Sequence, residues 1–195
     1  MQAHNPDLTV WRSAGGFRSA VKAKLDEVDS DNFFSNDGRS LREAWVGAEL
    51  SKYLPQISAM RLGRDQWPDC EAIVGGKLLP IEVTEALMPN RARRREYQSA
   101  QSSHSVLHVD QSEFDSRRRE IPIRLRAVCA KKASKCYPTN GALVVYLNIG
   151  THDWWREEIE KQISECTQIA CDRFVFVWVI WSGRLYQPWP LLHSA

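Results

Sequence analysis

Two carboxylates lie on either side of a predicted tight turn in the segment WPDCEAIVGGKLLPIEVTEA, residues 67–86. Gly75 and Gly76 favour a two-residue hairpin, because the primed turns of such hairpins need positive φ at their centre. Counting outward from this turn places Asp69 opposite Glu82, with their Cβ atoms about 4.5–5.5 Å apart on one face. Like charges held in that position destabilise a sheet unless a positive charge lies between them. A hard divalent cation with oxygen ligands is therefore the simplest candidate.

The alternation of side chains along the two strands separates an acidic face from an apolar one. The parity that pairs Asp69 with Glu82 also puts Glu71 and Thr84 on their face. The opposite face is mostly apolar and carries Cys70, Ala72, Val74, Leu79, Ile81 and Val83. One interpretation is that Asp69 begins a turn after Pro68 and that Glu82 is solvated. Because Glu82 interrupts an otherwise apolar strand, we favour the other interpretation, a functional site.

The same residues resemble a known motif. Pro68 and Asp69, a short gap, and then Glu82 within an apolar strand resemble the PD-(D/E)XK motif of the restriction-endonuclease-like superfamily. The resemblance implies an α/β fold with a mixed central sheet flanked by helices and an αβββαβ core, here about residues 40–149. It also implies a divalent-metal-dependent nuclease that hydrolyses phosphodiester bonds, with Mg²⁺ or Mn²⁺ held by the two acids.

A glutamate from the first core helix often completes such a site, and Glu43 is the matching candidate. In the helix expected over residues 40–54, Glu43 aligns with Gly47, Leu50 and Leu54. A carboxylate on an apolar stripe is costly unless it is paired or bound to a metal ion. An acid near a helix start is also favoured by the helix dipole, and this alternative stays open.

The sequence departs from the motif at its third element, where Thr84 replaces a lysine. In the family this lysine is thought to orient or activate the attacking water, and threonine cannot supply its charge. In some members a basic residue of the following helix takes over. The candidates for this role, and for contacts with nucleic acid, are Arg91, Arg93, Arg94 and Arg95. A solvated helix face is the alternative interpretation of this run.

Hydrophobic periodicity and turn residues predict the elements that position these residues. Expected helices span 16–28, 40–54, 89–102 and 122–135, with a further one after Asp153; expected strands span 57–62, 67–74, 77–85, 142–149 and 174–181. Ser40 is the expected N-cap of its helix, and Pro122 suits a first turn. Residues 30–38 are expected to form a loop, and 103–120 an irregular insertion. We expect one domain over 1–195, with a helix at 14–29 and a helix and strand at 152–181 added to the core.

Composition limits the class of protein. The net charge of +2 does not by itself indicate a nucleic-acid-binding protein. Five cysteines without CxxC spacing indicate reduced thiols and a cytoplasmic location. No stretch of 18 apolar residues is present, so no membrane is expected as a partner.

Together these observations favour a nuclease whose partner is nucleic acid, DNA in preference to RNA, with a homodimer left open. The alternative is a catalytically inactive nuclease-fold protein that acts as a nucleic-acid-binding or assembly module. Thr84 is the residue that favours this alternative. The acids at positions 43, 69 and 82 argue against it, because an inactive site has no need of facing carboxylates.

Overall fold

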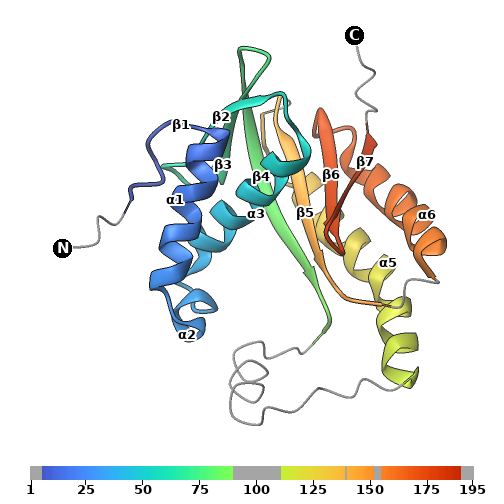
Figure 1. Cartoon of the computed structure of the whole chain (residues 1–195). Coiled ribbons are helices and arrows are strands. Elements are labelled where there is room, and N and C mark those ends of the chain that lie inside the picture. Colours follow the sequence, from blue (N-terminus) through green and yellow to red (C-terminus); the bar gives the residue numbers. More distant parts are fainter. Residues whose placement is uncertain (1–5, 90–110, 139, 152–154, 190–195) are drawn as a thin grey trace. The chain divides into compact units, whose positions relative to one another are not determined.

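A computed structural model describes residues 6–89, 111–138, 140–151 and 155–189. It has a mixed α/β fold (Figure 1), in which helices flank strands that pair in both antiparallel and parallel directions. The α/β class predicted from the sequence is therefore confirmed. The chain divides into two compact units within one long strand: unit 1 ends at Val83, and unit 2 begins at Thr84. Each unit is described by itself below, and the single-domain organisation stays a prediction.

Unit 1 is built on antiparallel strands that follow one another in chain order. Its elements are β1 (Arg12–Ser13), α1 (Ala14–Glu27), α2 (Ser30–Phe33), α3 (Arg39–Tyr53), β2 (Ile57–Leu62), β3 (Cys70–Val74) and the first part of β4 (Lys77–Leu87). The hydroxyl of Ser13 caps α1 by accepting a 3.1 Å hydrogen bond from the N–H of Gly16. Helices α1 and α3 pack against each other and against β2.

Helix α3 approaches the strands closely at Gly47. A Cβ atom there would lie 3.1 Å from Sγ of Cys70 and 3.4 Å from Cε of Met60, so a larger side chain would push the helix away. Leu50 and Leu54 are buried on the same stripe of the helix, as the periodicity predicted. This stripe sets the distance between α3 and the base of the hairpin.

The hairpin of β3 and β4 has the predicted turn and register. Gly75 and Gly76 have φ values of 56° and 77°, as a primed turn requires. Val74 faces Lys77, and the pairing continues outward in the predicted register to Cys70 opposite Ile81. The ladder ends at this pair, so Asp69, which precedes Cys70 in the chain, lies just outside it.

Unit 2 contains the end of β4 and the C-terminal elements. These are α5 (Gln111–Ala133), β5 (Ala142–Asn148), α6 (Arg156–Thr167), the short 3₁₀ helix η2 (Gln168–Ala170), β6 (Phe176–Trp181) and β7 (Arg184–Trp189). Strands β5 and β6 are parallel, and β7 returns antiparallel to β6. Helix α6 has an apolar stripe, because Ile159, Ile163 and Cys166 are buried in a core shared with α5, β5 and β6.

Several boundaries differ from the sequence predictions. Helix α5 begins at Gln111, so an irregular insertion is wrong from that residue onward, and Pro122 lies inside the helix rather than in its first turn. Ion pairs at helical spacing (Glu113 with Arg117, Glu120 with Arg124) stabilise this polar stretch as a helix. Its buried positions are Ile121, Leu125, Cys129 and Lys132, which recur every three or four residues and give it a core-facing stripe.

The remaining differences concern helix starts and short elements. The N-cap of α3 is Gly38 and not Ser40. A Cβ at position 38 would overlap the carbonyl oxygens of Asn32 and Phe33, so only glycine fits. The expected loop over 30–38 contains α2, and the two-residue β1 and the strand β7 were not predicted. The helix expected over 89–102 lies outside the described residues except at its Pro89 start, and Asp153 lies outside them as well.

Within the part of the chain that the structure describes, no helix combines the length and apolarity needed to cross a bilayer.

Candidate functional site

Asp69 lies directly before β3, where the ladder to β4 ends. Its Oδ2 accepts a 2.8 Å hydrogen bond from the backbone N–H of Val83. The residue is only 6% exposed, so this charge-assisted bond is largely shielded from water. The carboxylate therefore takes the place of a main-chain acceptor at the end of the ladder and is directed toward β4.

Glu82 is the residue of β4 that precedes Val83. It is 3% exposed, so the interpretation of Glu82 as a solvated strand residue is wrong. Its neighbours Ile81 and Val83 are buried as well. A carboxylate in such surroundings is stable as an anion only where positive charge or hydrogen-bond donors compensate for lost hydration.

Arg39, the first residue of α3, brings a positive charge to these acids. Its Nε donates a 2.6 Å hydrogen bond to Oε1 of Glu43, one turn along the helix, and its Nη2 lies 3.7 Å from Oδ1 of Asp69. The hydrogen bond and the charge of Glu43 raise the pKa of the guanidinium, and Asp69 and Glu82 add to this shift. Arg39 therefore stays charged, and it partly neutralises a group of three carboxylates.

The first turn of α3 is held over the site by Cys70. The thiol of Cys70 donates a weak hydrogen bond to the carbonyl oxygen of Glu43, with Sγ 3.6 Å from that oxygen. Burial raises the pKa of this thiol well above its usual range, and the charges of Asp69 and Glu43 add to the shift. The thiol therefore stays neutral and serves as a fixed contact rather than a reactive group.

The loop before Asp69 requires Gly63. Its N–H donates a 2.9 Å hydrogen bond to the carbonyl oxygen of Asp69, and a Cβ at this position would overlap the carbonyl oxygen of Pro68. The peptide bond between Trp67 and Pro68 is cis. The backbone of Asp69 is thus fixed from both sides, by this loop and by the ladder.

Two other acids of β3 and β4 are held in an ion pair or a hydrogen bond. Glu71 forms an ion pair with Arg61, its register partner on β2, and Arg61 stacks on the ring of Trp11. In unit 2, Oε1 of Glu85 accepts a 3.1 Å hydrogen bond from Nδ2 of Asn148. Glu71 is therefore held by Arg61 and not by Arg39.

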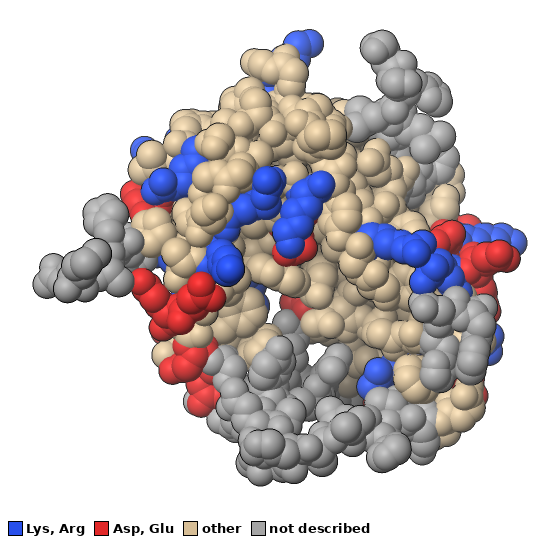
Figure 2. Space-filling model, in the orientation of Figure 1, with Lys and Arg blue, Asp and Glu red and all other residues tan. Residues whose placement is uncertain are grey.

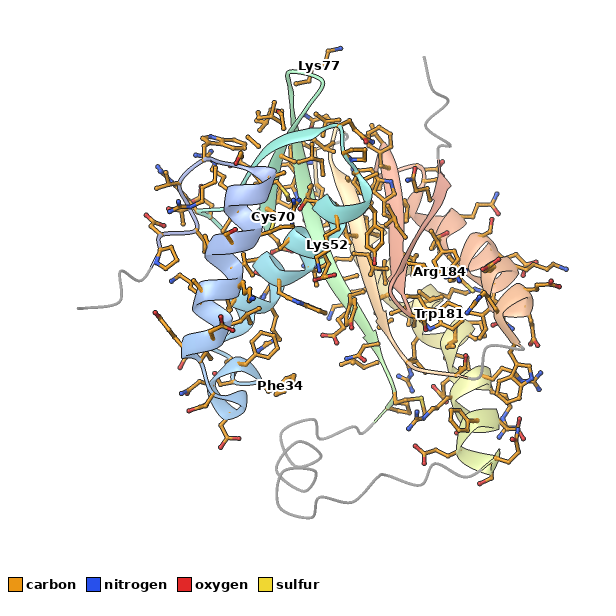
Figure 3. All side chains as sticks on the ribbon, in the orientation of Figure 1. Phe34, Lys52, Cys70, Lys77, Trp181 and Arg184 are labelled. Carbon is orange, nitrogen blue, oxygen red and sulfur yellow. The ribbon has the colours of Figure 1, made fainter. Side chains whose placement is uncertain are left out.

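Thr84, which replaces the motif lysine, and Lys77, the basic residue of the hairpin, are placed as follows. Thr84 lies in β4, partly exposed, two residues after Glu82. Figure 3 shows Lys77 at the tip of the hairpin, pointing away from Cys70 near its base. Lys77 therefore cannot serve as a substitute for the lysine. The structural role of Arg91, Arg93, Arg94 and Arg95 stays a prediction, because these residues lie outside the described residues.

The surface of the described residues carries charges of both signs (Figure 2). Figure 2 shows basic and acidic side chains intermixed over the described part of one face, without a continuous basic surface. This agrees with the small net charge of the chain. Electrostatic attraction of a polyanion by the described part of this face is therefore local and not general.

The chemistry of the donors at Asp69 and Glu82 suits a hard divalent cation, because both offer carboxylate oxygens in a shielded position. A complete ligand set is not assembled: among the described residues, no three His, Cys, Asp or Glu side chains are grouped to hold one ion. Glu43, the predicted third ligand, directs one oxygen to Arg39 instead. The groups that the described part of the site offers to a ligand are the oxygens of two shielded acids and the guanidinium of Arg39.

Sequence reasoning missed Arg39 and Gly63. Arg39 carried a signal, since it stands four residues before Glu43, the spacing of a helical ion pair, although the predicted helix began at residue 40. Gly63 carried none, because its role depends on the path of the loop that follows. Comparison with known proteins gives no family: no protein-family model, curated protein or solved structure matches the chain.

Proposed function

We propose that this protein is a divalent-metal-dependent nuclease of the PD-(D/E)XK type that hydrolyses phosphodiester bonds in DNA. The observation that carries the proposal is the pair of buried carboxylates, Asp69 and Glu82, at the base of an otherwise apolar hairpin. Buried acids next to each other are costly, and proteins retain them mainly where they do chemistry or bind a cation. The motif resemblance and the α/β fold support the same function.

Asp69 and Glu82 would hold Mg²⁺ or Mn²⁺, and Glu43 would assist. The ion would polarise the scissile phosphate and lower the pKa of the attacking water, which provides a nucleophile at neutral pH. Asp69 is suited to this role because the N–H of Val83 fixes one of its oxygens and leaves the other directed toward Arg39. Burial of both acids keeps water from competing for their oxygens and strengthens their hold on a cation.

The second candidate function is a nuclease-like module that binds nucleic acid without cleaving it. One observation favours it: Thr84 supplies no charge at the position of the motif lysine. The two functions differ in one measurable property, metal-dependent cleavage.

Cleavage of supercoiled plasmid by the purified full chain tests the proposal. We expect nicking with Mg²⁺ or Mn²⁺ that stops with EDTA and falls at least about a hundredfold in Asp69→Ala and Glu82→Ala. Glu71→Ala is the matched control, because it removes an acid from the same hairpin that pairs with Arg61 instead. Cleavage that survives in either folded site variant would exclude that residue from the reaction.

A further inference from the structure

We propose that Arg39 contacts the scissile phosphate and supplies the positive charge that Thr84 lacks, and that Glu43 positions it. This inference rests on the proposed function and names a further catalytic residue of the same site. Sequence reasoning had assigned the basic role to arginines that follow the hairpin. The structure instead has a guanidinium from the start of α3 beside the two acids.

The guanidinium of Arg39 has N–H groups that can still donate hydrogen bonds to a ligand. Of its five N–H groups, the one on Nε is used by Glu43, and Nη2 lies too far from Asp69, at 3.7 Å, for a good hydrogen bond. Neither terminal nitrogen donates a hydrogen bond to any described residue of unit 1. The side chain of Arg39 is 65% exposed, so this open end faces solvent at the site.

The free end has the geometry that a phosphate requires. The two terminal nitrogens of arginine form a planar fork that matches two phosphate oxygens. The bond from Nε to Glu43 restricts rotation of the guanidinium plane, so the fork is oriented before a ligand arrives. Glu43 is therefore a positioning residue for Arg39, whether or not it also contacts a metal ion.

The formal charges of the site also favour a contact between Arg39 and a phosphate. Counted as carboxylates, Asp69, Glu82 and Glu43 carry three formal negative charges, of which a divalent cation offsets two. Addition of the Arg39 guanidinium makes the group neutral, so that a phosphodiester can approach without net repulsion.

The test measures DNA binding and cleavage separately, using the full chain. Binding of a fluorescent DNA duplex is followed in Ca²⁺ at several salt concentrations, and plasmid cleavage is followed in Mg²⁺. Arg39→Gln should reduce the salt slope by about 0.9, the value for one phosphate contact, and slow cleavage about a hundredfold. Arg39→Lys should keep the salt slope, because it keeps the charge, and should recover only part of the cleavage.

Lys52→Gln is the matched control. Lys52 lies in the last turn of the same helix (Figure 3) and pairs with Glu49, as Arg39 pairs with Glu43. Lys52→Gln lowers the net charge of the protein by the same amount as Arg39→Gln. It should leave cleavage unchanged and should reduce the salt slope by less than the value for one phosphate contact. Glu43→Gln should leave the salt slope unchanged, because the charge of Arg39 stays. It should slow cleavage, because the guanidinium of Arg39 loses its fixed orientation. Thermal melting confirms that each variant is folded.

The outcomes separate the two proposals. If wild type cleaves and Arg39→Gln matches Lys52→Gln in both assays, the role of Arg39 is wrong and the nuclease stands. If wild type binds with an Arg39-dependent slope but never cleaves, the phosphate contact stands and the nuclease is wrong. If wild type neither binds nor cleaves, both are wrong. Should Arg39→Gln fail to fold, Arg39→Lys and Glu43→Gln decide, and full cleavage by both would overturn the proposal.

Discussion

The hydrogen bond between Asp69 and Val83 makes a prediction that does not depend on any activity. Asp69→Ala removes the side-chain acceptor of the Val83 N–H, which is a bond to a charged group in a buried position. The loss of such a bond costs about 1.5–3 kcal/mol. Asp69→Asn keeps an oxygen that can accept the same bond, so it separates the hydrogen bond from the charge.

The charge of Asp69 has two opposing effects in the metal-free protein. Its attraction to Arg39, whose side chain is largely exposed, contributes no more than about 1 kcal/mol. Its repulsion of Glu82 costs about 0.2–1 kcal/mol if the two lie as near neighbours on paired strands. Because these effects nearly cancel, Asp69→Asn should leave the free energy of unfolding within about 1 kcal/mol of wild type.

Unfolding in EDTA, by heat and by urea, measures both variants. Asp69→Ala should melt about 4–8 °C below Asp69→Asn, since about 2 kcal/mol corresponds to that shift in a chain of this size. Mn²⁺ at a hundredfold excess over its Kd should stabilise wild type by about 2.7 kcal/mol, and both variants by much less. Equal stability of the Ala and Asn variants in EDTA would refute the structural role of the hydrogen bond.

Three further predictions concern the surroundings of the site and the thiols. Gly63→Ala should lower the melting temperature and abolish cleavage together, because its Cβ overlaps the carbonyl oxygen of Pro68; a stable, active variant would contradict this. Arg61→Gln should leave cleavage unchanged and cost no more than about 1 kcal/mol in urea unfolding, since surface ion pairs contribute little. Maleimide at neutral pH should label the exposed Cys136 quickly and Cys129 only after unfolding, because burial raises the pKa of the Cys129 thiol to about 12; equal rates in the folded protein would show that Cys129 is accessible.

The hairpin shows what the sequence can determine. A two-glycine turn fixes which residues face each other, because the side-chain period of a strand is two and any slip moves every residue to the other face. The predicted register from Val74 to Cys70 is confirmed for this reason. The burial of Glu82 was not predicted, because its apolar neighbours Ile81 and Val83 lie on the opposite face of the strand.

The placement of Asp69 could not be predicted in the same way. The count from the turn assumed that the ladder continues to Asp69, but it ends at Cys70, and the side chain of Asp69 bonds to Val83. The end of the ladder depends on the loop between Gly63 and Pro68, whose path is set by backbone contacts that leave no periodic pattern. The direction of a side chain at such a point is a property of the loop and not of the strand.

The residue that brings positive charge to Asp69 and Glu82 could not be predicted from the sequence either. Like charges at Asp69 and Glu82 predicted a positive group near them, with a metal ion as the simplest one. The structure has the guanidinium of Arg39 there. Two segments far apart in sequence meet at this point, and local patterns do not specify such contacts. The start of α5 was missed for a different reason, because charged residues at helical spacing look like an irregular polar segment.

The most direct test of the central claim is anomalous diffraction from crystals of the full chain soaked in Mn²⁺. The account predicts one manganese peak in contact with carboxylate oxygens of both Asp69 and Glu82, at about 2 Å, the distance usual for small divalent cations. Crystals of Asp69→Asn soaked in parallel should show a weaker peak or none. A manganese ion bound elsewhere, or an acid pair that takes up no metal at saturating concentration, would contradict the account.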